Sequence, residues 1–208
     1  MEISAIETRR GSLYEIFVGG ESAGLVDIET AQMMHIRVGS VLTDEEWFAL
    51  CEESEKNRAK EYGLYLLERR SYTRRGLQLK LTSKYSPKVT ELVLSRFEEL
   101  GLLNDADYAR RYASDLYRLK HFSGVRIVTE LLKKGIDRDL AKETVDALFE
   151  QENESPRDNI RVLLETKFSS YLSDEKGVQR VVARLQRMGY RWEDIKYAIR
   201  EYADNIEE

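Results

Sequence analysis

The chain has 208 residues, of which 42% are hydrophobic and 34% are charged, and its formal net charge at pH 7 is −5. Its apolar runs are only a few residues long, which excludes a membrane-spanning helix, and residues 1–4 lack the features of a secretory signal. Cys51 is the only cysteine, so an internal disulfide is excluded and a reducing, cytoplasmic location is expected.

The charges are distributed unevenly along the chain. Residues 1–54 hold three arginines against eleven acidic residues, a net charge of −8. Residues 55–208 hold 30 basic and 27 acidic residues, a net charge of +3. The sequence pI of about 5.4 argues against tight binding of naked DNA by charge alone, although a local basic surface is compatible with it.

The first 43 residues are predicted to form a small β subdomain. A turn signal at residues 10–12 precedes a short apolar and aromatic strand, residues 13–18. Gly19 and Gly20 then favour a hairpin turn, with residues 23–28 returning as a second strand.

A helix is predicted to begin directly after this subdomain. Thr43 and Glu46 have the spacing of a capping box, in which threonine is the N-cap and glutamate stands three residues later. The apolar stripe that follows is compatible with one long helix to about Arg69, or with two helices joined near Ser54. Residues 44–54 are assigned to a connecting helix.

From about residue 55 onward the sequence repeats itself. Three anchor residues are separated by 51 and 54 positions: Lys84, Gly135 and Gly189. An arginine stands nine positions before each anchor: Arg75, Arg126 and Arg180. An apolar residue stands seven positions before each anchor: Leu77, Val128 and Val182. A period near 50 residues is typical of stacked supersecondary units that cannot bury their apolar faces alone.

The repeat region is therefore predicted to be a tandem array of three three-helix repeats, which makes the fold class mainly α. The repeats are assigned to residues 55–103, 104–152 and 153–208. Their helices are expected at residues 55–70, 74–83, 87–100, 105–120, 124–134, 138–150, 156–169, 174–188 and 192–204. Because about 50 residues is near the lower limit for independent stability, the repeats are expected to pack on one another.

The sequence contains no recognisable catalytic constellation. Its two histidines, His35 and His121, are far from Cys51, so neither a zinc site nor a cysteine–histidine pair is indicated. Gly19 and Gly20 lack the following lysine of a phosphate-binding loop. We expect no enzyme activity, no metal and no cofactor.

A recurring cationic pattern gives the candidate site residues. Those predicted to contact a partner or DNA are Arg70, Arg74, Arg75, Lys80, Arg110, Arg111, Arg126, Lys133, Lys134, Arg180, Arg184 and Arg187. Arg180, Arg184 and Arg187 are spaced by four and three residues, so they share one helix face. The alternative is that these residues form solvated helix faces or pair with acids on neighbouring helices and serve the fold.

The motifs of the second repeat resemble those of the RecX regulatory proteins. The resemblance is carried by residues 105–112 (DADYARRY), 122–127 (FSGVRI) and 130–136 (ELLKKGI), preceded by the link at residues 99–105. The first repeat agrees at Arg70, Thr73, Leu77 and Leu81. It departs from the family pattern at Lys84, where a glycine is usual, and at Gly76, where a glutamate would complete a capping box.

This resemblance implies a non-enzymatic modulator of the RecA recombinase. RecX-like proteins dock along the helical groove of the RecA filament on single-stranded DNA and lower its ATP hydrolysis, strand exchange and stimulation of LexA cleavage. The implied partner is thus the RecA filament on single-stranded DNA, with weak direct DNA contact, no membrane association and a monomeric protein. Multivalent weak contacts along an elongated array would suit such a partner.

Two other functions fit the pattern of helices. A helix-turn-helix-like regulator would use three short helices to read DNA, but the second helices lack the run of Asn, Gln or Arg typical of base reading. A helical scaffold would bind peptides along its repeats. Sequence-specific footprinting would reveal the first function, and recovery of partners other than a recombinase would favour the second.

Overall fold

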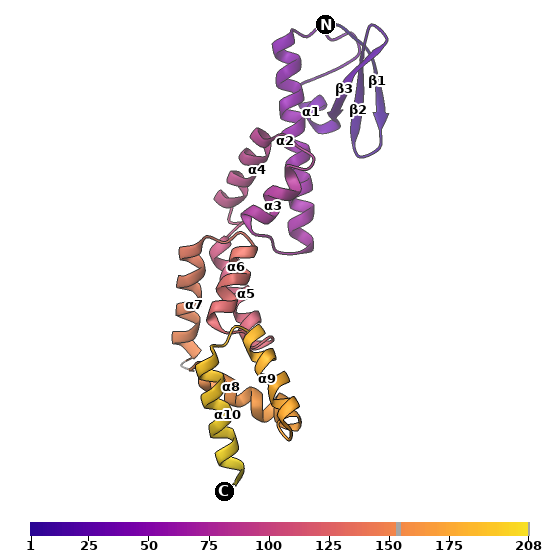
Figure 1. The fold of residues 1–208 in the computed structure, drawn as a ribbon. Coiled ribbons are helices and arrows are strands. Elements are labelled where there is room, and N and C mark those ends of the chain that lie inside the picture. The colour runs from indigo at the N-terminus through magenta and orange to yellow at the C-terminus, as the bar shows by residue number, and fades with distance from the viewer. Residues whose placement is uncertain (153–154, 208) are drawn as a thin grey trace. The chain divides into compact units, whose positions relative to one another are not determined.

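The computed structural model describes residues 1–152 and 155–207, and the side chains up to residue 204 within them. The described chain is mainly helical, with a small antiparallel sheet at the N-terminus followed by three three-helix repeats (Figure 1). The predicted fold class is therefore confirmed. The chain divides into two compact units, Met1–Asn104 and Asp105–Glu208. The finer boundaries between the predicted segments stay a prediction.

The N-terminal sheet has three strands rather than the two predicted. They are β1 (Ile3–Arg9), β2 (Leu13–Val18) and β3 (Glu21–Asp27), paired antiparallel in the order β1-β2-β3. Strand β1 was missed because its isoleucines, Ile3 and Ile6, are three residues apart and do not alternate with polar residues. The register of β1 against β2 shifts between Ile3 and Ala5, and this bulge lets both isoleucines face the same core.

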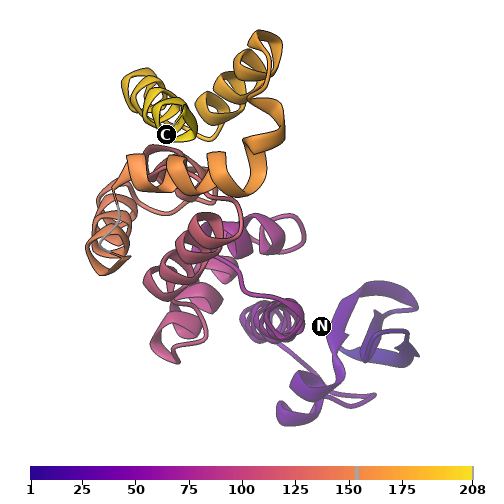
Figure 2. The same cartoon turned by 90° about the horizontal axis from the view of Figure 1, so that it is seen from below.

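The predicted second strand, residues 23–28, ends one residue earlier in the structure. Asp27 accepts a hydrogen bond from the Thr30 backbone N–H at 2.9 Å and thereby begins helix α1 (Ile28–Met33). This short helix carries no extended apolar stripe, so the sequence did not indicate it. The sheet lies on one side of helix α2 in both views (Figures 1 and 2).

Helix α2 (Asp44–Arg69) is one continuous helix and serves two cores. Its predicted capping box is present, since Thr43 and Glu46 bond each other's backbone N–H groups. Its first half buries Leu50 against the sheet, and its second half buries Ala59 against the first repeat. The predicted connecting helix and the first helix of the first repeat are therefore the same helix.

The first repeat is completed by α3 (Arg74–Leu81) and α4 (Pro87–Glu99). Thr73 caps α3, and Ser86 caps α4 with proline in the first turn, so both helices begin where they were expected. Phe97 of α4 is 1% exposed and lies against Gly63 of α2. The absence of a side chain at position 63 therefore lets the two helices approach closely.

Replacing Gly63 by alanine is expected to destabilise the first unit. A Cβ at this position would lie 2.6 Å from a ring carbon of Phe97, and overpacking of this kind costs about 1–3 kcal/mol. The gain in helix propensity, about 1 kcal/mol, offsets only part of that cost. Urea denaturation of Gly63→Ala should show a lower midpoint than wild type, with exposed Lys60→Ala as the control. A stabilised Gly63→Ala protein would contradict this packing.

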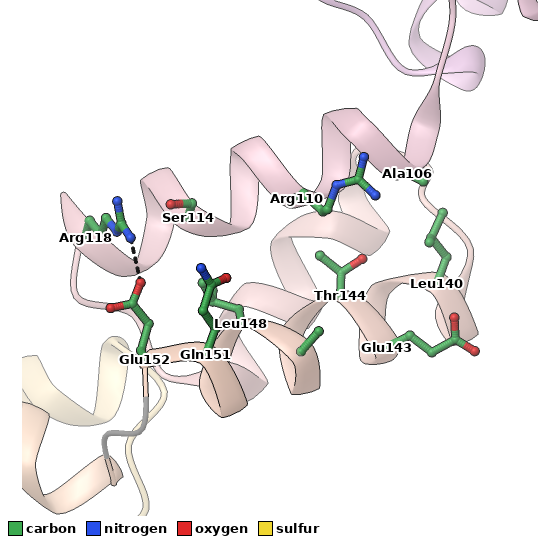
Figure 3. Close-up of a pocket in the computed structure, with 11 residues that line it drawn as sticks. Ala106, Arg110, Ser114, Arg118, Leu140, Glu143, Thr144, Leu148, Gln151 and Glu152 are labelled. Atoms are coloured by element: carbon green, nitrogen blue, oxygen red, sulfur yellow. Dashed lines mark hydrogen bonds and ion pairs between the residues drawn. The ribbon is translucent and has the colours of Figure 1, made fainter.

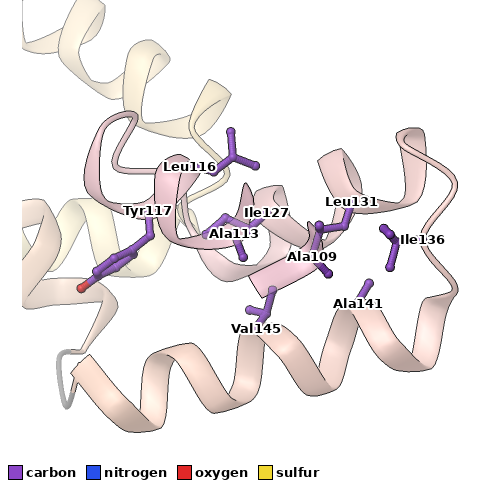
Figure 4. Packing of buried hydrophobic residues seen from close by; sticks show 9 residues of the cluster. All are labelled: Ala109, Ala113, Leu116, Tyr117, Ile127, Leu131, Ile136, Ala141 and Val145. Atoms are coloured by element: carbon purple, nitrogen blue, oxygen red, sulfur yellow. The ribbon is translucent and has the colours of Figure 1, made fainter. Parts of the chain in front are cut away.

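The second repeat consists of α5 (Asp105–Arg118), α6 (Gly124–Lys133) and α7 (Arg138–Glu152). Small residues of α5, Ala109 and Ala113, lie opposite Ala141 and Val145 of α7 (Figure 4). Leu131 of α6 is fully buried in the same cluster. The predicted apolar stripes therefore meet in one core.

The third repeat departs from regular helix in its first segment. Helix α8 (Pro156–Leu163) continues as a π-helical turn, η1 (Leu164–Phe168), and a 3₁₀ turn, η2 (Ser169–Tyr171). The single helix predicted for residues 156–169 is wrong in this part. The repeat is completed by α9 (Glu175–Arg187) and α10 (Trp192–Glu207).

The buried residues correct the predicted repeat register. The middle helix of each repeat buries an apolar pair four residues apart: Leu77 and Leu81, Ile127 and Leu131, Val181 and Leu185. Leu77 therefore corresponds to Ile127 and Val181, not to Val128 and Val182. By the same shift, Gly76 rather than Arg75 occupies the place of Arg126 and Arg180.

The shift arises because the turn after the middle helix is one residue shorter in the first repeat than in the other two. Gly135 and Gly189 adopt positive φ angles of 86° and 93°, whereas Lys84 does not adopt a positive φ. The apolar or aromatic residue that follows the turn is Tyr85, Ile136 or Tyr190, and it stands four positions after the buried leucine in the first repeat but five positions after it in the second and third. The first repeat thus lacks the left-handed glycine and one residue of the turn.

The second and third repeats are joined by direct hydrogen bonds. The Ser123 backbone N–H donates to the Met188 carbonyl at 3.0 Å, and the Tyr190 hydroxyl donates to the His121 carbonyl at 3.0 Å. A Cβ on Gly189 would lie 2.4 Å from the Ser123 Oγ atom. Position 189 therefore requires glycine both for its φ angle and for the close approach of the two repeats.

Candidate functional site

Two of the four cations predicted in the first repeat contact other side chains of the fold: Arg74 forms ion pairs, and the Arg70 guanidinium lies over the Tyr72 ring, 4.5 Å from its centroid. The Arg74 Nε atom lies 3.0 Å from an Oε atom of Glu98, and Arg74 also pairs with Glu91 of the same helix, α4. Arg74 therefore joins α3 to α4, which is the fold-stabilising alternative considered above. The other three are exposed at the surface of the first unit: Arg70, Arg75 and Lys80.

Two cations at the start of the second repeat share one carboxylate. The Asp107 side chain lies 3.5 Å from a guanidinium nitrogen of Arg110 and 2.7 Å from one of Arg111. All three residues are on α5, within one turn of each other. These exposed pairs partly neutralise the arginines, and such pairs contribute about 0.3–0.5 kcal/mol each to stability.

A single carboxylate on α6, that of Glu130, pairs with two of the predicted cations. Glu130 lies 2.8 Å from Arg126 and 3.0 Å from Lys133. Lys134 lies over the ring of Tyr112, with its Nζ atom 5.4 Å from the ring centroid. The five cations predicted in the second repeat are therefore all in contact with neighbouring side chains of the fold.

The predicted cations of the third repeat have a different environment. Val181 and Leu185 face the core of the repeat, and this turns Arg180, Arg184 and Arg187 outward on α9. Among the side chains that the structure describes, none forms an ion pair with these three arginines. The prediction that they share one exposed helix face is therefore met by the geometry.

These arginines line a groove that reaches across the second and third repeats. The groove has a volume of about 830 Å³. Its cationic lining residues are Lys120, Lys167, Arg180, Arg184 and Arg187. None of the described residues that line it is acidic. We call this feature the cationic groove.

Aromatic side chains complete the cationic groove. Phe122 of the second repeat and Phe168 and Tyr171 of the third repeat line it. Tyr171 is 51% exposed, so its ring is available to a ligand. A groove that combines cations with an accessible aromatic ring is suited to a phosphate backbone and to a stacked base.

The irregular first segment of the third repeat places two of the lining residues. Leu163 and Leu164 are both buried, and a regular α-helix would carry the residues after them along the same path. The π-helical turn and the following 3₁₀ turn change that path. Lys167, Phe168 and Tyr171 thereby line the groove opposite α9.

The charge of the groove affects the neighbouring histidine. Burial, and secondarily the positive charge of Lys167, lower the pKa of His121. Because the unfolded chain binds this proton more readily, stability falls as the pH drops from the ordinary imidazole pKa to the lowered one.

Removing the charge of Lys167 is expected to raise the pKa of His121. Burial remains in Lys167→Gln, so the pKa should move only part of the way to the ordinary value. An NMR titration of the His121 imidazole measures this, with Lys142→Gln as a control of the same chemistry on α7. An unchanged His121 pKa would show that the two side chains do not interact.

Sequence reasoning found the α9 arginines but missed the opposite side of the groove. Lys167, Phe168 and Tyr171 were assigned to a regular helix or left unassigned, and the π-helical turn has no sequence signal of its own. The available signal was a basic residue close to an aromatic residue in the sequence: Lys120 lies two residues before Phe122, and Lys167 directly precedes Phe168.

A smaller groove between α5 and α7 has balanced charges. Arg118 and Glu152 form an ion pair of 2.7 Å across it, and Arg110 and Glu143 lie on its two sides (Figure 3). An apolar groove of about 640 Å³ also lies along α6 and α7, near Gly189. Neither has the one-sided charge of the cationic groove.

The described residues hold no group of three or more His, Cys, Asp or Glu side chains that could bind a metal ion. Within the same part of the chain, no helix is long and apolar enough to cross a membrane.

Comparison with known proteins identifies the family. Residues 104–145 match the family model of the second three-helix domain of RecX. The regulatory protein RecX of Streptomyces coelicolor is 33% identical over 129 residues, which cover 61% of this chain and 68% of the relative. The chain belongs to the RecX family. The predicted resemblance is therefore confirmed.

Other RecX proteins match over nearly the whole chain. Regulatory protein RecX of Caldanaerobacter subterraneus is 28% identical over 195 residues, covering 93% of this RecX chain and 95% of its own length. That of Clostridium tetani is 24% identical over 206 residues. These homologues are named regulatory proteins, in agreement with the expectation of a regulator rather than an enzyme.

Solved structures share the fold. The crystal structure of a regulatory protein RecX aligns with a TM-score of 0.65 at 19% identity and covers 94% of this chain and 97% of its own. RecX from Lactobacillus salivarius aligns with a TM-score of 0.60 at 21% identity, covering 71% of this chain and 96% of its own. This RecX chain therefore has the architecture of its family.

Proposed function

We propose that this protein regulates the RecA recombinase by binding the RecA filament on single-stranded DNA. Binding lowers the ATPase, strand-exchange and LexA-coprotease activities of the filament, and so acts in DNA repair and the SOS response. The protein acts without catalysis of its own, as a monomer in the cytoplasm. Membership of the RecX regulatory family over most of the chain carries this proposal.

The cationic groove supports the proposal from physical chemistry. Five cations line it without a described carboxylate to balance them, although the whole chain has a net charge of −5. A polyanionic partner gains most from such a local concentration of charge. We therefore propose that the second and third repeats contact the filament through this groove.

The groove also separates the predicted cations into two groups. Arg74, Arg110, Arg111, Arg126 and Lys133 already have carboxylate partners. Recruiting them to a partner would require breaking those ion pairs. We therefore assign the larger part of the interaction to Arg180, Arg184 and Arg187, with Lys120 and Lys167 beside them.

Co-sedimentation with RecA filaments tests the proposal. Filaments are assembled on circular single-stranded DNA with a slowly hydrolysed ATP analogue and pelleted with the purified protein. We expect the protein in the pellet with filaments, and much less of it with the same DNA alone. Equal recovery on bare DNA would instead favour the helix-turn-helix-like regulator, and absence from both pellets would exclude filament binding.

A further inference from the structure

The cationic groove is built by two repeats. Lys120 and Phe122 come from the loop between α5 and α6, in the second repeat. The α9 arginines and Lys167 come from the third repeat. The groove therefore has its full set of cations only when the loop is held against the third repeat.

The loop has a defined local conformation. The His121 backbone N–H donates to the Tyr117 carbonyl at 2.9 Å, and the Phe122 N–H donates to the Leu116 carbonyl at 3.2 Å. His121 adopts a φ angle of 53°, in the left-handed region that a residue with a side chain rarely adopts. The surrounding contacts must therefore fix this conformation.

The third repeat supplies such a contact. The Tyr190 hydroxyl donates to the His121 carbonyl at 3.0 Å, and Tyr190 itself is 6% exposed. Ser123 also bonds the third repeat through its backbone N–H, which donates to the Met188 carbonyl. Lys120, directly before His121, is exposed and lines the groove.

We propose that the cationic groove is one composite site for an unpaired nucleic-acid strand, and that Tyr190 is its positioning residue. Tyr190 does not itself line the groove. It holds the His121 carbonyl, and thereby places the adjacent Lys120 in the groove with the arginines of α9. The choice of a single strand as the ligand rests on the proposed function, because the RecA filament is assembled on single-stranded DNA.

The lining residues favour an unpaired strand over an acidic polypeptide. Cations alone would suit either ligand, but Tyr171 offers an exposed ring on which a base can stack, and Phe122 and Phe168 support the groove from the core side. Base stacking on an aromatic side chain requires bases that are not enclosed in a duplex. Tyr171, half exposed at the groove, gives the direct test of this choice.

The test measures the binding of a fluorescein-labelled oligothymidylate by fluorescence anisotropy at several salt concentrations. Tyr190→Phe removes only the hydroxyl and should weaken binding about three- to tenfold. Lys120→Gln should weaken it similarly and reduce the slope of log K against log salt by about 0.7, the value of one phosphate contact on a single strand. Tyr202→Phe, in the core of the third repeat, is the matched control and should bind as wild type.

A double-mutant cycle separates positioning from general stability. If Tyr190 acts by placing Lys120, the double variant Tyr190→Phe/Lys120→Gln should bind no more weakly than Lys120→Gln. Independent, multiplicative losses would overturn the positioning role, as would unchanged binding by Tyr190→Phe. Thermal unfolding of each variant is recorded to confirm that the third repeat remains folded.

Two further measurements test whether the ligand is a nucleic-acid strand or an acidic polypeptide. Tyr171→Ala should weaken oligothymidylate binding about five- to 100-fold, and polyglutamate should compete poorly. Unchanged binding by Tyr171→Ala, with equal competition by polyglutamate, would replace the strand with an acidic polypeptide. If the protein binds oligothymidylate and the effects of Tyr190→Phe and Lys120→Gln are coupled, but the protein has no effect on RecA filaments, this inference is upheld and the proposed function is contradicted. If the protein inhibits RecA but the effects of the two substitutions are independent, the proposed function is upheld and the positioning role of Tyr190 is contradicted.

Discussion

Arg180→Glu/Arg184→Glu is expected to abolish inhibition of RecA at concentrations where the wild-type protein inhibits fully. Both arginines are exposed on α9, line the cationic groove and form no ion pair with any described side chain. Each reversal should cost about 1.4 kcal/mol or more of binding free energy through the lost contact and added repulsion, so the loss in affinity should reach about 100-fold. The measurement is the concentration for half-maximal inhibition of strand exchange.

The control changes the same number of charges elsewhere. Arg75→Glu/Lys80→Glu reverses two exposed cations of α3 that the sequence also predicted as site residues. The shift in net charge is identical, so a difference between the two variants reports on the groove itself. Equal loss of inhibition in both variants would mean that overall charge governs binding. Loss in the α3 variant alone would move the site to the first repeat.

Gly189→Ala is expected to destabilise the second unit strongly. Alanine would strain the backbone at a φ of 93°, and its Cβ would lie 2.4 Å from the Ser123 Oγ atom and 2.7 Å from the Arg126 Cβ atom. Left-handed strain costs about 1–2 kcal/mol and overpacking about 1–3 kcal/mol, which together give about 3 kcal/mol of unfolding free energy. Urea denaturation followed by circular dichroism measures it.

Gly101→Ala separates the two causes. Gly101 has a φ of 69°, but a Cβ there would meet nothing within 4 Å. The free energy of unfolding of this control should therefore fall only by the cost of the backbone strain. If Gly189→Ala were no more destabilised than Gly101→Ala, the close approach of the second and third repeats would not contribute to stability.

Local sequence signals predicted the helices well because capping and apolar spacing act within a few residues. Thr43 begins a helix as predicted, and Thr73 and Ser123 cap the two helices that were expected to begin at residues 74 and 124. Strand β1 was missed because a bulge changes which of its residues share a face. The first repeat was aligned one residue out because its turn lacks the left-handed glycine that the other two use.

The candidate site was predicted only in part, because local spacing can be read from the sequence but tertiary packing cannot. The spacing of Arg180, Arg184 and Arg187 fixes their common face whatever surrounds the helix. Whether a cation has a carboxylate neighbour on another helix, as Arg74 has on α4, depends on tertiary packing. The contribution of Lys167 depends on a π-helical turn and on the joining of two repeats, and neither follows from local periodicity.

The most direct test of the account is ATP hydrolysis by preformed RecA filaments on single-stranded DNA as the protein is titrated in. The binding of the protein to the same DNA without RecA is measured in parallel. The account predicts inhibition well below stoichiometric amounts, with much weaker affinity for bare DNA. Undiminished hydrolysis at saturating protein, together with tight binding to DNA alone, would contradict it and favour a DNA-binding regulator.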